Sequence, residues 1–266
     1  MSMFLPQLLK RAEQGEKLVA LTCYDASFAR ILADNGVDIL LVGDSLGMTV
    51  QGHATTLPVS LEHMVYHTEA VARGVASADG TAFIMADLPF GSYQASPQAA
   101  FDSAARLMAA GANMVKLEGG AVMVETVAFL SQRGIPVCAH LGLMPQSVNQ
   151  TGYRSQGRDH KAAAQLIEDA ATLEAAGAQM MLVESIPATL AAEVTNCLTI
   201  PTIGIGAGPN CDGQVLVLQD LLGMTPKPPR FAKDFMTGAS NISDAVSRYA
   251  QAVRKGSFPG TEHQFQ

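Results

Sequence analysis

Short apolar runs recur along the chain, and each is bounded by turn residues and followed by a helical pattern. Continuous apolar strands of this kind are typical of a parallel sheet that is covered on both faces. The pattern predicts strands at residues 18–22, 39–43, 83–87, 114–118, 136–140, 180–184 and 201–206, with a less regular one at 215–218. Helical patterns lie between them, among others at residues 101–110, 121–133 and 162–176.

One unit is repeated. Residues 104–118 read AARLMAAGANMVKLE and residues 170–184 read AATLEAAGAQMMLVE: a helical pattern, a Gly-Ala turn, an apolar strand and a terminal acid. Residues 31–44, ILADNGVDILLVGD, form a looser copy with one extra residue before the acid. Gly111 and Gly177 stand where a helix must turn into the left-handed region, which glycine does without a Cβ clash. The repeat is half of a βαβ unit.

Seven or eight such units in 266 residues, with no linker-like segment between them, predict one α/β domain. A (β/α)8 TIM barrel is typically built from about 250 residues, which fits this length. We therefore expect a single barrel over residues 1–266, with an N-terminal helix and a C-terminal helical extension at 242–254. A doubly wound open sheet is the alternative.

Charged residues make up only 15% of the chain and hydrophobic residues 48%. About 25% of residues are charged in an average soluble domain, so this chain has either a large core or a broad surface that other subunits cover. We expect both, and therefore an obligate homo-oligomer. The 17 Lys and Arg against 24 Asp and Glu give a net charge of −7. This balance argues against a protein that binds the phosphate backbone of nucleic acids.

The 4 cysteines are far apart and form no CxxC pair, so we interpret them as reduced thiols of a cytoplasmic protein. The N-terminal segment has no apolar stretch typical of a signal peptide. No run approaches the roughly 18 apolar residues of a membrane span. We expect no membrane partner and a cytoplasmic location.

Polar residues gather at the ends of the predicted strands. These residues are Asp44, Ser45, Asp87, Glu118, His140 and Glu184. In a barrel such side chains converge on the C-terminal mouth, where barrel enzymes keep their active sites. Lys116 precedes Glu118 by two residues, so both point to the same face of their strand, together with Met114. A buried Lys–Glu pair needs partners, and an anionic ligand with a cation would satisfy it.

The carboxylates of Asp44, Asp87 and Glu118 suit a hard ion such as Mg²⁺, held partly through water and substrate oxygens. A 2-oxo acid can chelate such an ion through its keto oxygen and one carboxylate oxygen. The ion would then act as a Lewis acid and stabilise the enolate that forms on deprotonation. Glu184 ends an apolar strand with no Lys or Arg close in sequence, and it is the candidate base.

Each of these residues also has a structural interpretation. Asp44 or Asp87 can act as the N-cap of the following helix, and Lys116 can extend to the rim with only its stem buried. A lone histidine such as His140 is more often a hydrogen-bonded structural residue than a catalyst. The occurrence of all of them at strand ends favours a functional site.

The segment GIGAG at residues 204–208 follows a predicted strand. Its spacing is GxGxG rather than GxGxxG, and PNCDG follows instead of a helical pattern, which argues against a dinucleotide-binding fingerprint. We expect its backbone to line the barrel mouth and to face a second substrate.

Several motifs resemble those of the ketopantoate hydroxymethyltransferase family. They are TCYDASFA (22–29), LLVGDSLGM (40–48), GHATTLPV (52–59), ADLPF (86–90), NMVKLEGG (113–120), VCAHLGLMPQS (137–147), LVES (182–185) with Pro187, and IGIGAGPNCDGQ (203–214). The resemblance extends from about Leu18 to Phe258.

The resemblance implies a barrel of the phosphoenolpyruvate mutase/isocitrate lyase type. It implies transfer of a hydroxymethyl unit from 5,10-methylenetetrahydrofolate to 3-methyl-2-oxobutanoate, which gives 2-dehydropantoate for pantothenate synthesis. Asp44, Asp87 and Glu118 correspond to a Mg²⁺ site, and Glu184 corresponds to the proton acceptor. The 2-oxo acid site corresponds to Asp44, Ser45, Asp87 and Lys116. Our own hypothesis is that His140 positions the substrate or a proton-carrying water. Bacterial members of the family are cytoplasmic homodecamers.

Two segments depart from the family pattern. LVESIP replaces a Glu-Cys-Val-Pro or Glu-Ala-Val-Pro sequence, and KPPRFAK stands where a PKFAK-like stretch is common, which leaves the contact of this late loop with the folate open. A 2-oxo acid lyase of the same superfamily is one alternative function, although the Lys-Lys-Cys-Gly-His type motif of the lyases does not occur in the chain. A non-catalytic barrel that binds a 2-oxo acid is the other.

Overall fold

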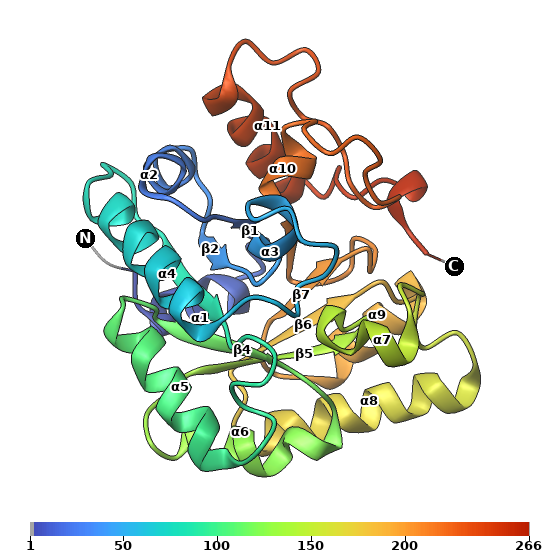
Figure 1. Ribbon diagram of the computed structural model, residues 1–266. Coiled ribbons are helices and arrows are strands. Elements are labelled where there is room, and N and C mark those ends of the chain that lie inside the picture. The colour runs from blue at the N-terminus through green and yellow to red at the C-terminus, as the bar shows by residue number, and fades with distance from the viewer. Residues whose placement is uncertain (1–2, 266) are drawn as a thin grey trace.

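Eight parallel strands close into a barrel in the order in which they occur along the chain. The computed structural model describes residues 3–265, and Figure 1 shows strands at its centre with helices around them. The strands are β1 Leu18–Thr22, β2 Ile39–Val42, β3 Phe83–Asp87, β4 Met114–Glu118, β5 Val137–Gly142, β6 Met180–Glu184, β7 Thr202–Ile205 and β8 Gly213–Leu216. Pairing of β8 with β1 completes the ring. The predicted barrel is confirmed, and the open doubly wound sheet is excluded.

Helices surround the strands (Figure 1). One helix precedes the first strand, and further helices follow the last strand. The α-helices are α1 Leu5–Glu13, α2 Ala26–Asp34, α3 Leu46–Thr49, α4 Leu61–Ala76, α5 Pro97–Ala109, α6 Val124–Ser131, α7 Val148–Thr151, α8 His160–Ala175, α9 Ala188–Cys197, α10 Leu218–Leu221 and α11 Ile242–Arg254. The 3-10 helices are η1 Ala121–Met123, η2 Pro145–Ser147 and η3 Thr261–His263. No helix in the part of the chain that the structure describes is long and apolar enough to cross a membrane.

Alternation along the strands divides the apolar core into two clusters. Side chains such as Ile39, Phe83 and Met114 fill the interior of the barrel, whereas Val115 and Leu117 belong to the outer cluster, which packs beneath the helices. The inner cluster also contains Leu8 of α1, so the N-terminal helix covers one end of the barrel. Tyr249 fixes the C-terminal helix to the sheet, because its hydroxyl donates to the carbonyl of Ala20 at 3.0 Å.

The repeated unit corresponds to α2–β2, α5–β4 and α8–β6. The glycine between helix and strand has a positive φ in each copy: 83° at Gly36, 110° at Gly111 and 107° at Gly177. A residue with a Cβ is strained in this region of φ, so each unit depends on glycine to reverse the chain after its helix.

Four strands differ from the predicted bounds. β2 ends at Val42 rather than at 43, and β7 spans Thr202–Ile205 rather than 201–206. β5 begins at Val137 rather than at 136, because proline has no N–H for the ladder. β8 begins two residues before the predicted start because Gly213 is pressed between its neighbours: a Cβ there would lie 2.6 Å from the carbonyl oxygen of Leu18. Leu218, predicted as the last strand residue, is the first residue of α10.

Candidate active site at the C-terminal end of the barrel

A cavity of about 750 Å³ opens at the C-terminal ends of the strands. All the side chains predicted to form the site line it: Asp44, Ser45, Asp87, Lys116, Glu118, His140 and Glu184. The strand register brings them together, because Asp87 pairs with Lys116 across β3 and β4, and Glu118 pairs with His140 across β4 and β5. Residues on the inner face of β4 therefore meet those of both neighbouring strands.

Lys116 is buried inside the barrel, with only 4% of its surface exposed, so it does not extend to the rim. Its Nζ lies 3.0 Å from Oδ1 of Asp87. The two groups are not aligned for a hydrogen bond, and this buried oxygen has no hydrogen-bond partner among the described residues. Burial would lower the pKa of Lys116, but the carboxylates of Asp87 and Glu118 outweigh it and raise that pKa. Lys116 is therefore a permanent cation among acids.

Asp44 lies just beyond β2 and is also buried. Its backbone N–H donates to Oδ2 of Asp87 at 3.1 Å. Burial, together with the negative charges of Asp87 and Glu118, raises the pKa of Asp44 to about 8. Neither aspartate caps a helix, because Ser45 and Ser96 occupy the N-cap positions of α3 and α5. The structural interpretation of these two acids as N-caps is therefore wrong.

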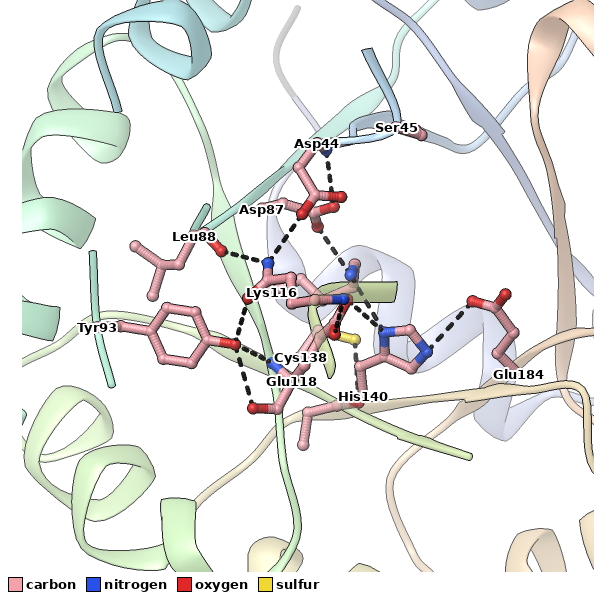
Figure 2. Close-up of polar contacts among 12 residues, drawn as sticks. Asp44, Ser45, Asp87, Leu88, Tyr93, Lys116, Glu118, Cys138, His140 and Glu184 are labelled. Carbon is pink, nitrogen blue, oxygen red and sulfur yellow. Dashed lines mark hydrogen bonds and ion pairs between the residues drawn. The ribbon is translucent and has the colours of Figure 1, made fainter. Parts of the chain in front are cut away.

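His140 lies between two glutamates, as Figure 2 shows. Its Nδ1 is 3.6 Å from Oε1 of Glu118, and its Nε2 is 3.4 Å from Oε2 of Glu184. Burial and the charge of Lys116 would lower the pKa of His140, yet its contacts with the two glutamates raise it overall. The two glutamates therefore favour the protonated form of the ring.

Glu184 is the most accessible of the acids, with 14% of its side chain exposed to the cavity. Ser185, which follows it, has a φ of 51°, a left-handed conformation that is uncommon outside glycine and often occurs at functional sites. The backbone on both sides is fixed: the carbonyl of Glu184 accepts from Leu143 at 2.8 Å, and the N–H of Ser185 donates to Ile205 at 2.9 Å. The end of β6 thus aims this carboxylate into the cavity.

Ser45 follows Asp44 and lines the same cavity. Its Oγ lies 2.9 Å from the hydroxyl of Tyr24, so either group can donate to the other. A Cβ at Gly43 would lie 2.7 Å from this Oγ, which explains the glycine at that position. When Tyr24 donates to Ser45, the hydroxyl proton of Ser45 can therefore be donated to an anionic ligand.

The sequence analysis missed two buried residues that hydrogen-bond to the acids of the site or to their backbone, Gln146 and Tyr93. Gln146 lies in η2, and its Nε2 donates to Oδ2 of Asp44 at 2.9 Å. Its backbone N–H donates to Oε2 of Glu118 at 3.0 Å. Tyr93 donates to Oε1 of Gln146 at 2.7 Å. The only sequence signal was the position of Gln146 in the VCAHLGLMPQS motif, six residues after His140.

The outer part of the cavity is formed by the loop after β5 and by the late segment of the chain. Tyr153, Arg154, Lys227 and Phe231 contribute to it. The prediction that the GIGAG backbone lines the mouth is wrong for most of that segment, because Ile205 alone of residues 204–208 lines the cavity. A Cβ at Gly206 would lie 2.7 Å from the ring of Phe231, so aromatic side chains cover this backbone.

The profile of the ketopantoate hydroxymethyltransferase family matches residues 2–261. The chain belongs to this family. It is 61% identical to the 3-methyl-2-oxobutanoate hydroxymethyltransferase of Thiobacillus denitrificans over 266 residues, which is 100% of both chains. It is also 61% identical to the enzyme of that name from Nitrosospira multiformis, over 96% of this chain and 97% of the relative.

Solved structures with the same fold include a member of the phosphoenolpyruvate mutase/isocitrate lyase superfamily. Phosphonopyruvate hydrolase in complex with oxalate and Mg²⁺ has a TM-score of 0.62 at 13% identity and covers 98% of this chain and 93% of its own. A 2,3-dimethylmalate lyase described as a member of that superfamily has a TM-score of 0.52 at 18% identity and covers 75% and 70%. The predicted fold type of this family member is confirmed.

The carboxylates of Asp44, Asp87 and Glu118 could act as ligands of a hard dication. No three His, Cys, Asp or Glu side chains of residues 3–265 stand in positions to hold one metal ion together as they are placed. The chemistry of these oxygen donors nevertheless fits a hard divalent cation. Asp44, Asp87 and Glu118 share the buried site with Lys116, and burial together with the charges of the other two acids raises the pKa of Asp44 to about 8. A dication would favour the ionised forms of these acids, and Oδ1 of Asp87 has no hydrogen-bond partner among the described residues. Hard oxygen donors of this kind prefer Mg²⁺ over soft metals.

Proposed function

We propose that this enzyme transfers a hydroxymethyl unit from 5,10-methylenetetrahydrofolate to 3-methyl-2-oxobutanoate and so forms 2-dehydropantoate for pantothenate synthesis. The observation that carries the proposal is the cavity in which a buried cation, Lys116, faces carboxylates and an accessible acid, Glu184. Membership in a transferase family supports this function over the lyase and the non-catalytic alternatives.

The residues of the chain have distinct parts in the proposed reaction. Lys116 and Ser45 bind the carboxylate of the oxo acid through charge and hydrogen bonding. Glu184 takes the proton from C3, and the electron pair left on C3 attacks the methylene carbon of the folate iminium to form the new carbon–carbon bond. Water supplies the hydroxyl group, and tetrahydrofolate leaves. His140 lies 3.4 Å from Glu184 and orients its carboxylate.

Asp44 and Asp87, together with Glu118 directly or through water, would hold Mg²⁺. When bound, the ion supplies positive charge where the oxo acid develops negative charge on its oxygen. A 2-oxo acid with eight non-hydrogen atoms fills only a small part of the cavity of about 750 Å³. The outer part, near Arg154 and Lys227, is where we place the folate.

Proton NMR of a mixture of purified enzyme, Mg²⁺ and the two proposed substrates tests this function. We expect the signals of 2-dehydropantoate to grow while those of 3-methyl-2-oxobutanoate decline, and we expect no product without the folate. Cleavage of a 2-oxo acid without any folate requirement would instead favour the lyase. Binding without turnover would favour a sensor.

Lys116→Met is expected to weaken binding of the oxo acid. Methionine keeps the length of the side chain but removes the charge, and hydrogen bonds to charged groups contribute about 1.5–3 kcal/mol. The KM for the oxo acid should therefore rise roughly 10- to 100-fold, with a smaller fall in kcat, as expected when binding common to ground and transition states is lost. Steady-state kinetics with varied oxo acid measures the two constants.

Lys161→Met, an exposed lysine of α8, is the matched control and should keep wild-type constants. A Lys116→Met variant with an unchanged KM and a reduced kcat would contradict the binding role.

We also propose a cytoplasmic homo-oligomer, with ten subunits as the family implies. Large apolar side chains such as Tyr66 and Val122 are 66% and 80% exposed in the single chain. All four cysteines are free thiols, which supports a reducing compartment. Light scattering should give a mass that is a multiple of 27.9 kDa, about tenfold for a decamer. A mass equal to that of one chain in dilute buffer would contradict oligomerisation.

A further inference from the structure

The side chain of Gln146 uses all its hydrogen-bonding capacity inside the site. Its Nε2 donates to Oδ2 of Asp44 and to the carbonyl of Leu88, each at 2.9 Å. Its Oε1 accepts from Tyr93 at 2.7 Å and from Nε2 of Gln94 at 3.1 Å. An amide has two donors and two acceptor positions, so none is left for a ligand. Gln146 is 5% exposed and therefore acts on its protein neighbours.

The orientation of this amide is determined by its neighbours. Tyr93 is 1% exposed, and its hydroxyl accepts from the N–H of Glu118 at 3.1 Å while it donates to Gln146. Gln94 also presents a donor to the same oxygen. With Oε1 facing these donors, Nε2 must face Asp44. Tyr93 and Leu88 lie across the Asp87–Lys116 pair from Glu184, on the side of the site away from the proposed base (Figure 2).

Gln146 contacts both carboxylates that flank the Lys116–Asp87 pair. Its side-chain amide donates a hydrogen bond to Oδ2 of Asp44, and its backbone N–H donates one to Oε2 of Glu118. Within the described residues, Oδ1 of Asp44 forms no hydrogen bond, and Oε1 of Glu118 lies 3.6 Å from His140. One oxygen of each acid is thus held by Gln146, whereas Oδ1 of Asp44 remains for a ligand and Oε1 of Glu118 faces His140.

We propose that Gln146, held by Tyr93, is a positioning residue of the metal site. It fixes one oxygen of Asp44 and one of Glu118, so that Oδ1 of Asp44 points to the cation and Oε1 of Glu118, beside His140, reaches it directly or through water. This inference rests on the metal-dependent function proposed above. Hydrogen-bonded partners of metal-binding carboxylates orient their ligands, and their loss commonly reduces metal affinity by about 10- to 100-fold. A role in packing alone would be fulfilled by an apolar side chain of the same length.

Gln146→Met tests the inference, because it keeps the length of the side chain and the backbone N–H to Glu118 but removes the amide. Mn²⁺ alone is the probe. The enzyme is titrated with Mn²⁺ in the absence of substrates, and electron paramagnetic resonance measures the concentration of unbound ion. We expect Kd to rise roughly 10- to 100-fold relative to wild type. Gln98→Met, an exposed glutamine on α5, is the matched control and should bind Mn²⁺ as wild type does.

Tyr93→Phe tests the second link in the chain of contacts. It removes the hydroxyl that orients the amide, so Kd for Mn²⁺ should rise by less than in Gln146→Met. Because Tyr93 acts mainly through Gln146, the effects of the two changes should not add in the double variant. Additive effects would show that Tyr93 acts independently of Gln146.

Kinetics supply a readout that a purely structural role would not change. The Mg²⁺ concentration for half-maximal activity should rise in Gln146→Met by the same factor as Kd for Mn²⁺, and activity at saturating Mg²⁺ should return to within a few-fold of wild type. A folded Gln146→Met protein with a lower Tm but wild-type Kd for Mn²⁺ would overturn the inference. Wild-type enzyme that binds no Mn²⁺ would overturn it together with the metal site, whereas an enzyme that binds Mn²⁺ yet forms no 2-dehydropantoate would contradict only the proposed reaction.

Discussion

Glu184→Gln is expected to lower turnover by roughly 100- to 10,000-fold, the loss typical when a general base is removed. Glutamine keeps the shape of the side chain and can still accept a hydrogen bond, but it cannot take a proton. The carboxylate lies at the end of β6, 3.4 Å from His140 and exposed to the cavity, so its replacement should leave the oxo acid site in place. Binding of the oxo acid should therefore change little while proton removal fails.

Exchange of the C3 proton of 3-methyl-2-oxobutanoate in deuterated water, followed by NMR without folate, isolates this step. Exchange should fall in parallel with turnover. Glu168→Gln, at an exposed position of α8, is the matched control and should exchange at the wild-type rate. If Glu184→Gln exchanged the proton as fast as wild type, Glu184 would not be the base, and His140 would become the next candidate.

Removal of the divalent metal is expected to reduce the same exchange and the overall reaction by roughly 1,000-fold or more. A Lewis-acid metal contributes several kcal/mol of charge stabilisation, and about 1.36 kcal/mol corresponds to a factor of ten. Without the ion, the negative charge that develops on the oxo acid would face Asp44, Asp87 and Glu118 with Lys116 as the cation nearest to them. Repulsion between this developing charge and the carboxylates should therefore slow the reaction.

Dialysis against EDTA, followed by assay before and after addition of Mg²⁺, measures the effect. Activity should return with Mg²⁺, since hard oxygen ligands favour it. Zinc held by cysteines is not expected, because burial raises the pKa of Cys138 and of Cys23 to about 12 and keeps both as thiols. Activity that persisted through EDTA treatment would exclude the metal site.

The sequence predicted the elements of this fold well, because the information for each lies within a short window. Four of the eight strands, β1, β3, β4 and β6, have the predicted bounds, as does α11. The errors fell where glycine or proline changed the pattern. Gly213 begins β8 because only a residue without a Cβ fits against β1, and nothing in the neighbouring sequence indicates that contact.

The sequence also predicted which face of a strand carries the chemistry. Strand alternation has a period of two, so Lys116 and Glu118 had to share one face once the strand was recognised. Closure of the barrel makes that face the interior, and the inner cluster of the core contains Met114 from the same face. The position of Glu184 at the end of its strand followed from the same local pattern.

Only the tertiary structure decided which of these groups meet. Lys116 contacts Asp87 rather than Glu118, its neighbour in sequence, and His140 lies between Glu118 and Glu184. Gln146, on a loop, reaches Asp44 across 102 positions of the chain. Alternation along a strand is a local property of the backbone, but partners across strands depend on register and on the path of loops. Those are set by packing of the whole barrel, which no short window of sequence contains.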